Sequence, residues 1–180
     1  MYLLQVSDFV GFFKLALSNL QEDDLQVYID RYEAEYVRKI FGVVMGDAVL
    51  QEIADAVGQS LPISQAYSNE TAAILFAFAK QDDNGCIFES KGLADVLRAF
   101  VFYHYITETQ ARHTPTGVIV HQAEVANIQS PYAAQRFAER KFNDALDSVD
   151  AIQWYCTTFA PADYPDYNGT TIKPKYDSLR

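Results

Sequence analysis

Apolar residues along positions 93–106 recur on almost every side of a helix rather than on a single face. Only Asp95, Arg98 and His104 interrupt this run. A helix that is apolar all round is normally buried on all sides. The run is shorter than the roughly 20 residues that a membrane span needs. We therefore expect it to be the central helix of a soluble bundle, with Ser90 as its N-cap.

A second and narrower pattern extends over residues 130–156. Its apolar positions alternate in steps of four and three: Ala138, Phe142, Ala145, Val149, Ile152 and Cys156. Such a seam is typical of a long helix that packs along another helix. Ser130 suits the cap, and Pro131 suits the first helical position, where its missing N–H costs nothing. The opposite side is expected to face solvent or a neighbouring subunit; it holds Arg136, Glu139, Arg140, Asp144 and Asp147.

Weaker patterns divide the N-terminal half of the chain. A short strand is expected over residues 2–6, and an acidic linker over residues 19–24. A helix with one apolar face follows over residues 25–40, and Gly42 is placed to end it. The other expected elements are a brief helical turn near Phe9, an extended segment over residues 15–17, helices over residues 47–57 and 70–80, a loop over 59–69, a tight turn over 81–85 and a strand fragment over 86–88.

Residues 114–129 are the most extended part of the chain, with many β-branched side chains and few helix signals. The segment exceeds the usual connection of about 4–6 residues, and long ordered connections tend to be functional. We predict a hairpin or a projecting arm that contacts a neighbouring subunit or another protein. The candidate contact residues are Thr114, Pro115, Thr116, Gly117, Val118 and Val120.

From Ala160 onward, prolines alternate with Tyr164, Tyr167 and Tyr176, which rules out a helix. Tyrosine provides a large, rigid contact area at low entropic cost. The segment over residues 160–180 is therefore expected to lie extended on another protein and to become ordered only in an assembly.

These patterns together predict a mainly α fold. It is a helical bundle with a long C-terminal helix, a short β-hairpin or extended arm, and an extended C-terminal tail. The expected division is a helical domain over residues 1–159, which includes the arm, and a tail over residues 160–180.

Composition narrows the classes of partner. The chain of 180 residues has a formal net charge of −10. Gripping a nucleic-acid backbone requires clustered Lys and Arg, so this charge argues against it. The N-terminus lacks the features of a signal peptide, and no apolar run is long enough for a membrane span. Cys86 and Cys156 lie in apolar surroundings and are expected to be reduced core residues in a cytoplasm.

Catalytic motifs are missing from the sequence. There is no phosphate-binding glycine loop, no nucleophile elbow and no His-Glu-x-x-His zinc pair, so we expect no enzyme activity and no cofactor. His104, His113 and His121 have no metal-ligand spacing. One core histidine and two histidines on an exposed loop are favoured over a metal site.

Two further groups of residues have a structural and a functional interpretation. Asp95 and Arg98 could form an intrahelical ion pair or reach polar groups of another subunit, and the ion pair is favoured. Tyr28, Tyr32 and Tyr36 could stack on a ligand. A core face whose hydroxyls reach the rim is the commoner arrangement of such a row, and it is favoured here.

Four segments carry a resemblance through their order and spacing. They are the helix from Asp24-Leu25 to Phe41-Gly42, the run from Gly92-Leu93 to Phe100-Val101-Phe102-Tyr103-His104-Tyr105-Ile106, the turn Thr114-Pro115-Thr116-Gly117-Val118, and Ser130 before the long helix. Over about residues 3–156, the chain resembles the head–tail connector or neck adaptor proteins of tailed phages that infect Bacteroides-type bacteria, crAss-like phages included.

The resemblance implies a virion structural protein, made in the host cytoplasm, that forms a homo-oligomeric ring beneath the portal protein. The ring, usually a dodecamer, would continue the DNA channel without specific binding and dock further neck or tail proteins. The acidic composition is compatible, because a wall that repels phosphate does not hold passing DNA. The alternative is an intracellular helical module for protein interaction or ligand binding, without catalysis.

Overall fold

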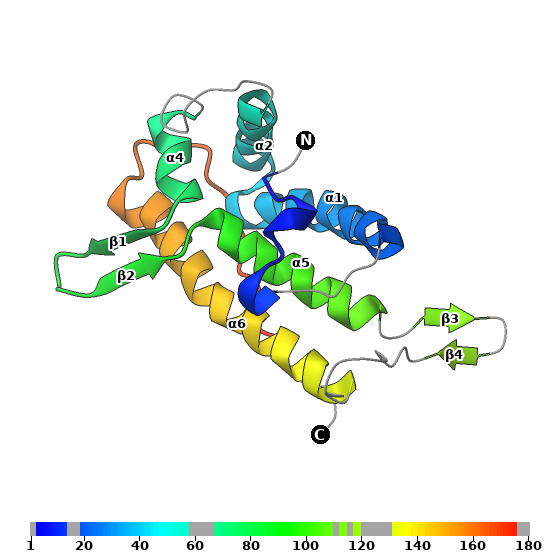
Figure 1. The fold of residues 1–180 in the computed structure, drawn as a ribbon. Coiled ribbons are helices and arrows are strands. Elements are labelled where there is room, and N and C mark those ends of the chain that lie inside the picture. Colours follow the sequence, from blue (N-terminus) through cyan, green and yellow to red (C-terminus); the bar gives the residue numbers. More distant parts are fainter. Residues whose placement is uncertain are drawn as a thin grey trace.

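A computed structural model describes residues 3–13, 19–57, 67–109, 112–114, 117–119 and 131–175. The fold is mainly helical with a long C-terminal helix, which confirms the predicted fold class. Helix α5 (Leu93–Thr109) lies between α1 (Asn19–Phe41) and α6 (Pro131–Trp154), as Figure 1 shows. None of the helices in the described ranges is long and apolar enough to cross a membrane.

Helix α5 is the central element, as its apolar pattern predicts. Its buried residues are Leu93, Val96, Leu97, Ala99, Phe100, Val101, Phe102 and Tyr105. The predicted N-cap is wrong by two residues, because the first intrahelical bond runs from the N–H of Val96 to the carbonyl of Gly92. Ser90 instead ends strand β2, and its hydroxyl accepts a hydrogen bond from the N–H of Gly92.

Helix α6 buries the whole predicted seam and continues into a π-helical turn, η3 (Tyr155–Phe159). Phe142 of the seam stacks on Phe100 of α5, with ring centroids 4.2 Å apart. The opposite side is exposed as expected, except for Glu139, which is buried. Its carboxylate accepts a hydrogen bond from the side chain of Gln135, one turn earlier, and this bond accommodates its burial.

Helix α1 starts earlier than predicted, since residues 19–24 are helical and do not form a linker. Negative charge at a helix N-terminus is favoured by the macrodipole, which accounts for the acidic start. Gly42 ends α1 as predicted and has a φ of +86°. Helix α2 (Val43–Val57) begins directly after it, four residues before the expected start, with the N–H of Gly46 bonded to the carbonyl of Gly42.

In its described part, residues 3–6, the expected N-terminal strand is not formed. Residues 6–8 and 11–13 are 3-10 turns, η1 (Val6–Asp8) and η2 (Gly11–Phe13). The N–H groups of Leu3 and Leu4 are bonded to the Glu33 carboxylate and therefore do not pair with a second strand. The segment predicted as extended, residues 15–17, lies outside the described residues.

Helix α4 (Asn69–Leu75) is shorter than the predicted helix over residues 70–80, because its second half is a strand. Strands β1 (Phe78–Gln81) and β2 (Ile87–Ser90) form an antiparallel hairpin around the predicted tight turn. Cys86 is exposed at this hairpin, so its expected core position is wrong. Cys156 is buried as expected, and burial raises the pKa of its thiol to about 12. Most of the predicted loop over residues 59–69 lies outside the described residues.

A second hairpin occupies the predicted arm. Strands β3 (Arg112–Thr114) and β4 (Gly117–Ile119) pair antiparallel, with Arg112 opposite Ile119. The hairpin extends beyond the ends of α5 and α6 (Figure 1). The structure thus favours a hairpin over an open loop for the first part of the arm, and residues 120–130 lie outside the described residues.

The C-terminal tail is non-helical as predicted, but it packs on its own chain. The N–H groups of Asn168 and Thr170 donate to the carbonyls of Phe41 and Lys39, at 3.0 and 2.7 Å. These carbonyls belong to the last turn of α1, where helix carbonyls have no partner within the helix. The expectation that the tail is ordered only in an assembly is therefore wrong for residues 160–175.

Candidate functional site

The predicted interface residues lie in two separate places. Thr114 and Gly117 are cross-strand partners in the arm hairpin, and Val118 belongs to β4. Pro115, Thr116, Val120 and Tyr176 lie outside the described residues. Tyr164 and Tyr167 belong to the tail.

The two tail tyrosines that the structure describes are packed within the chain. Tyr164 is 7% exposed, and its hydroxyl donates to the carbonyl oxygen of Glu70 at 2.7 Å. Tyr167 packs against the core, and burial raises the pKa of its phenol to about 12. These rings contact their own chain, which differs from the expectation that they contact another protein.

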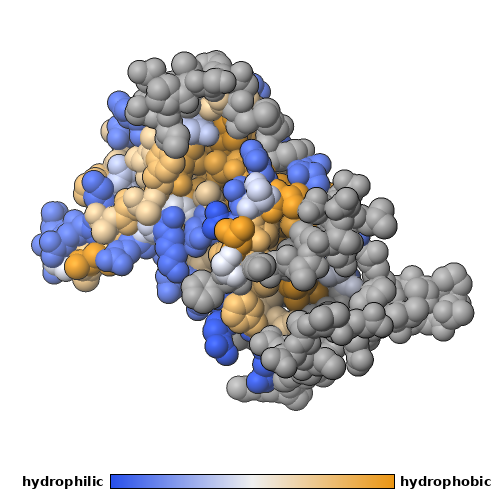
Figure 2. Space-filling model, viewed as in Figure 1, coloured by the Kyte–Doolittle hydropathy of each residue, from blue (hydrophilic) through white to orange (hydrophobic). Residues whose placement is uncertain are grey.

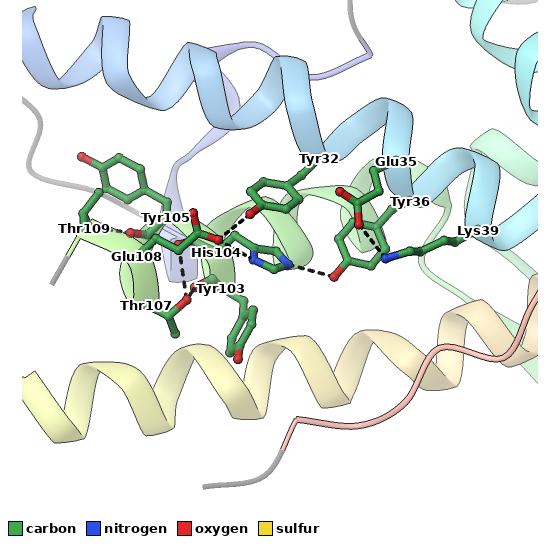
Figure 3. A network of polar contacts seen from close by, with 10 residues as sticks. All are labelled: Tyr32, Glu35, Tyr36, Lys39, Tyr103, His104, Tyr105, Thr107, Glu108 and Thr109. Atoms are coloured by element: carbon green, nitrogen blue, oxygen red, sulfur yellow. Dashed lines mark hydrogen bonds and ion pairs between the residues drawn. The ribbon is translucent and has the colours of Figure 1, made fainter. Parts of the chain in front are cut away.

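A polar network lies between α1 and α5 (Figure 3). The carboxylate of Glu108 accepts hydrogen bonds from the hydroxyl of Tyr32 and from Nδ1 of His104, the latter at 3.1 Å. Nε2 of His104 lies 2.8 Å from the hydroxyl of Tyr36. The ring of Tyr32 also stacks on the imidazole, with centroids 3.8 Å apart. One consistent assignment is a neutral imidazole with its proton on Nδ1, which accepts from Tyr36 at Nε2.

The protonation states in this network favour a structural role. Burial raises the pKa of both Tyr32 and Tyr36, so the two phenols stay neutral and act as donors. Burial also lowers the pKa of His104, although Glu108 opposes this shift. Both imidazole nitrogens have partners, and no metal-binding group of His, Cys, Asp and Glu is present among the described residues. The interpretation of the tyrosine row as a core face with hydroxyls at its rim is confirmed for Tyr32 and Tyr36.

From the sequence, Glu33 and Glu35 do not make a paired-carboxylate site, because they flank Ala34 and cannot face each other on a helix. The burial of the Glu33 carboxylate was not predicted. Its two oxygens accept from the N–H groups of Leu3 and Leu4, at 2.8 and 3.0 Å, and thereby fasten the N-terminal segment to α1. Burial raises its pKa to about 7, although the two backbone bonds oppose the shift. The burial of Glu33 could have been predicted from its position on the helix. It lies one turn after Ile29 and one turn before Val37, which are both buried.

The predicted intrahelical pair on α5 is present. Nη1 of Arg98 lies 3.4 Å from Oδ1 of Asp95, and the guanidinium also lies over the ring of Phe13. These contacts are made within one chain, as the favoured interpretation states.

A groove between the hairpin β1–β2 and helix α6 was not predicted. Its larger part has a volume of about 620 Å³ and is lined by Ala77, Phe78, Ala79, Glu89, Ser90, Lys91, Asp144, Asp147 and Ser148. A further part of about 360 Å³ shares Glu89 and Asp147 with it and adds Ile87, Phe88, Asp150 and Ala151. The groove could not be predicted without β1, which forms one wall and which the sequence pattern placed in a helix.

Comparison with protein-family models, with curated proteins and with solved structures gives no match for this chain.

Proposed function

We propose that this chain is a structural adaptor in the neck of a tailed phage, where copies of it form a ring below the portal protein. The ring continues the DNA channel and docks the next neck or tail protein. The observation that carries this proposal is the position of the two hairpins, which extend from opposite ends of the α5–α6 pair (Figure 1). Closed rings need two different surfaces on each copy, and hairpins at opposite ends of the α5–α6 pair would supply them.

The arm hairpin supports an assembly role through its size. Two-stranded hairpins are at best marginally stable in water when nothing packs against them. Strands β3 and β4 are three residues each and lie beyond the helical body (Figure 1). Contact with a second chain would supply the apolar burial that stabilises such a short hairpin.

Charge and resemblance support the same function. The net charge of −10 suits the wall of a channel through which DNA passes without being held. The segments that resemble phage neck adaptors include α5 and the start of the arm. The resemblance thus covers both the central helix and one of the two proposed contact surfaces.

Labelling of intact particles tests this function. An antibody raised against the chain, used with gold labelling on phage particles that carry this gene, is expected to mark the junction of capsid and tail. An antibody against the major capsid protein serves as the control for labelling elsewhere. Absence of the chain from purified particles would contradict the proposal, and so would labelling confined to another part of the virion.

A further inference from the structure

The groove between β1–β2 and α6 combines an apolar lining with an acidic rim. Alanine and phenylalanine residues of the hairpin and Ala151 of α6 supply apolar surface. Glu89, Asp144, Asp147 and Asp150 supply four carboxylates, and Lys91 is the basic residue of the lining. In Figure 2, the tip of the hairpin is mostly hydrophilic, and apolar surface lies between this tip and α4 and gathers over α4.

Two of these carboxylates line both parts of the groove. The side chains of Glu89 and Asp147 make no hydrogen bond or ion pair with any other residue of the described ranges. Asp147 also lies close enough to Asp150 to raise the pKa of that carboxyl, in addition to the effect of burial. The fold of a single copy therefore leaves negative charge gathered along this groove, and a cationic partner would relieve the repulsion.

The arm has the complementary composition. Between Thr109 and Ala123 the sequence contains no Asp or Glu, while it contains Arg112, His113 and His121. Strand β4 and the residue after it read Gly-Val-Ile-Val. The arm is thus a hairpin with a permanent positive charge and an apolar strand, in a chain whose net charge is −10.

We propose that the arm hairpin β3–β4 of one copy docks in the groove between β1–β2 and α6 of the next copy, where the positive charge of the arm meets the carboxylates of Glu89 and Asp147. The occupant is a second copy because the arm of each chain extends away from its own groove, at the other end of α5 and α6 (Figure 1). Such a contact joins two different surfaces and repeats from copy to copy, so it closes into a ring when the rotation permits. The inference rests on the proposed ring and names its two contact surfaces.

Charge reversal tests the contact on the full chain. Arg112→Glu changes the arm and leaves the groove intact, whereas Asp147→Arg changes the groove and leaves the arm intact. Each variant alone is expected to assemble about tenfold less tightly or worse, because like charges then face each other. Assembly is measured by mass photometry over a range of concentrations, and circular dichroism checks that both variants retain their helices.

Complementation separates a lost contact from a damaged fold. In an equimolar mixture of the two variants, the unaltered arm of D147R meets the unaltered groove of R112E, and the reversed arm of R112E meets the reversed groove of D147R. The mixture should therefore assemble although each variant alone does not, and the double variant R112E/D147R should assemble by itself. The matched controls are Asp83→Arg, on the same hairpin but outside the groove lining, and Arg31→Glu, exposed on α1; both should assemble like the unaltered chain.

Three outcomes overturn the inference. If both single variants assemble like the unaltered chain, the arm–groove contact is wrong while the ring function stands. If the single variants fail and neither the mixture nor the double variant recovers assembly, the proposed pairing of arm and groove is wrong. If the unaltered chain never assembles, both the arm–groove contact and the proposed ring are wrong.

Discussion

Glu33 shows how a single buried carboxylate can make the stability of this fold depend on pH. Its folded-state pKa of about 7 lies above the ordinary glutamate value of about 4.3. Between these two values the folded chain binds more protons than the unfolded chain. The free energy of unfolding should therefore fall as pH rises through this window, by up to about 1.4 kcal/mol per pH unit from this group.

The variant Glu33→Gln should remove this dependence. A glutamine does not titrate, but its NH2 group places a donor against the N–H of Leu3 or Leu4, whereas both oxygens of Glu33 accept from these groups. At pH 5 we expect a loss of about 1–2 kcal/mol, because one buried donor is left poorly satisfied. The difference from the unaltered chain should shrink by pH 8, as measured by urea unfolding at each pH.

The matched control is Glu35→Gln on the same helix. Glu35 is partly exposed, and its hydrogen bond to Lys39 lowers its pKa. The contribution of Glu35 to the free energy of unfolding therefore increases as pH rises, whereas that of Glu33 decreases. An exposed pair of this kind contributes at most about 1 kcal/mol. A Glu33→Gln variant whose stability changes with pH in parallel with the unaltered chain would contradict the assignment to Glu33.

At the scale of elements, the α5–α6 pair should account for much of the stability. Phe100 is fully buried and stacks on Phe142 and against Tyr36. Phe100→Ala is expected to lower the free energy of unfolding by about 3–5 kcal/mol. Phe159→Ala is the matched control, since Phe159 is 46% exposed and should cost much less. Equal losses for the two variants in chemical denaturation would show that the packing of Phe100 is not the main contribution.

The tail is a second element whose attachment can be tested. Gly169 lies so close to α1 that a Cβ there would collide with the carbonyl of Ile40, and backbone cannot move aside cheaply. Gly169→Ala should therefore detach residues 168–175. The side chain of Asn143 hydrogen-bonds to the backbone N–H and C=O of Lys175. Trypsin cleavage after Lys175 should therefore become faster in this variant. Thr171→Ala, at an exposed neighbouring position, should leave the rate unchanged. Equal rates for the two variants would contradict this attachment.

The elements that sequence could predict are the ones whose pattern is long and local. Helices α5 and α6 repeat their apolar positions over several turns, so their existence and their buried faces follow from the sequence. The turn over residues 81–85 and a strand fragment over 86–88 were predicted, and the latter matches β2. Strand β1 was missed because residues 70–80 are apolar enough to suit a helix, and only the pairing of Phe78 with Ser90 decides for a strand. The tail was predicted as non-helical, but its attachment to the carbonyls of α1 is a long-range contact that local pattern does not encode.

The candidate sites show the same division. The tyrosine row was correctly interpreted, for Tyr32 and Tyr36, from its spacing on one helix. Its partners His104 and Glu108 lie on α5, and no sequence signal links positions that are 68 and 76 residues apart. The groove beside β1–β2 needed the fold for the same reason, because its two walls come from β1–β2 and from α6.

At the scale of the whole molecule, the chain joins an acidic helical body to two hairpins at its opposite ends (Figure 1). The body supplies stability through α1, α5 and α6. In the proposed ring, the hairpins supply the surfaces through which copies meet. Such a ring is built from a single heterologous interface, because the same arm–groove contact repeats around the axis.

The mass of the assembled protein tests the proposed ring most directly. Native mass spectrometry of the purified full-length chain, with electron microscopy of the same sample, should show one closed oligomer with a fixed number of copies and a central opening. Because assembly depends on concentration, the sample is measured over a concentration series and with the portal protein added. A chain that stays monomeric across the whole series and fails to join the portal would contradict the proposed ring.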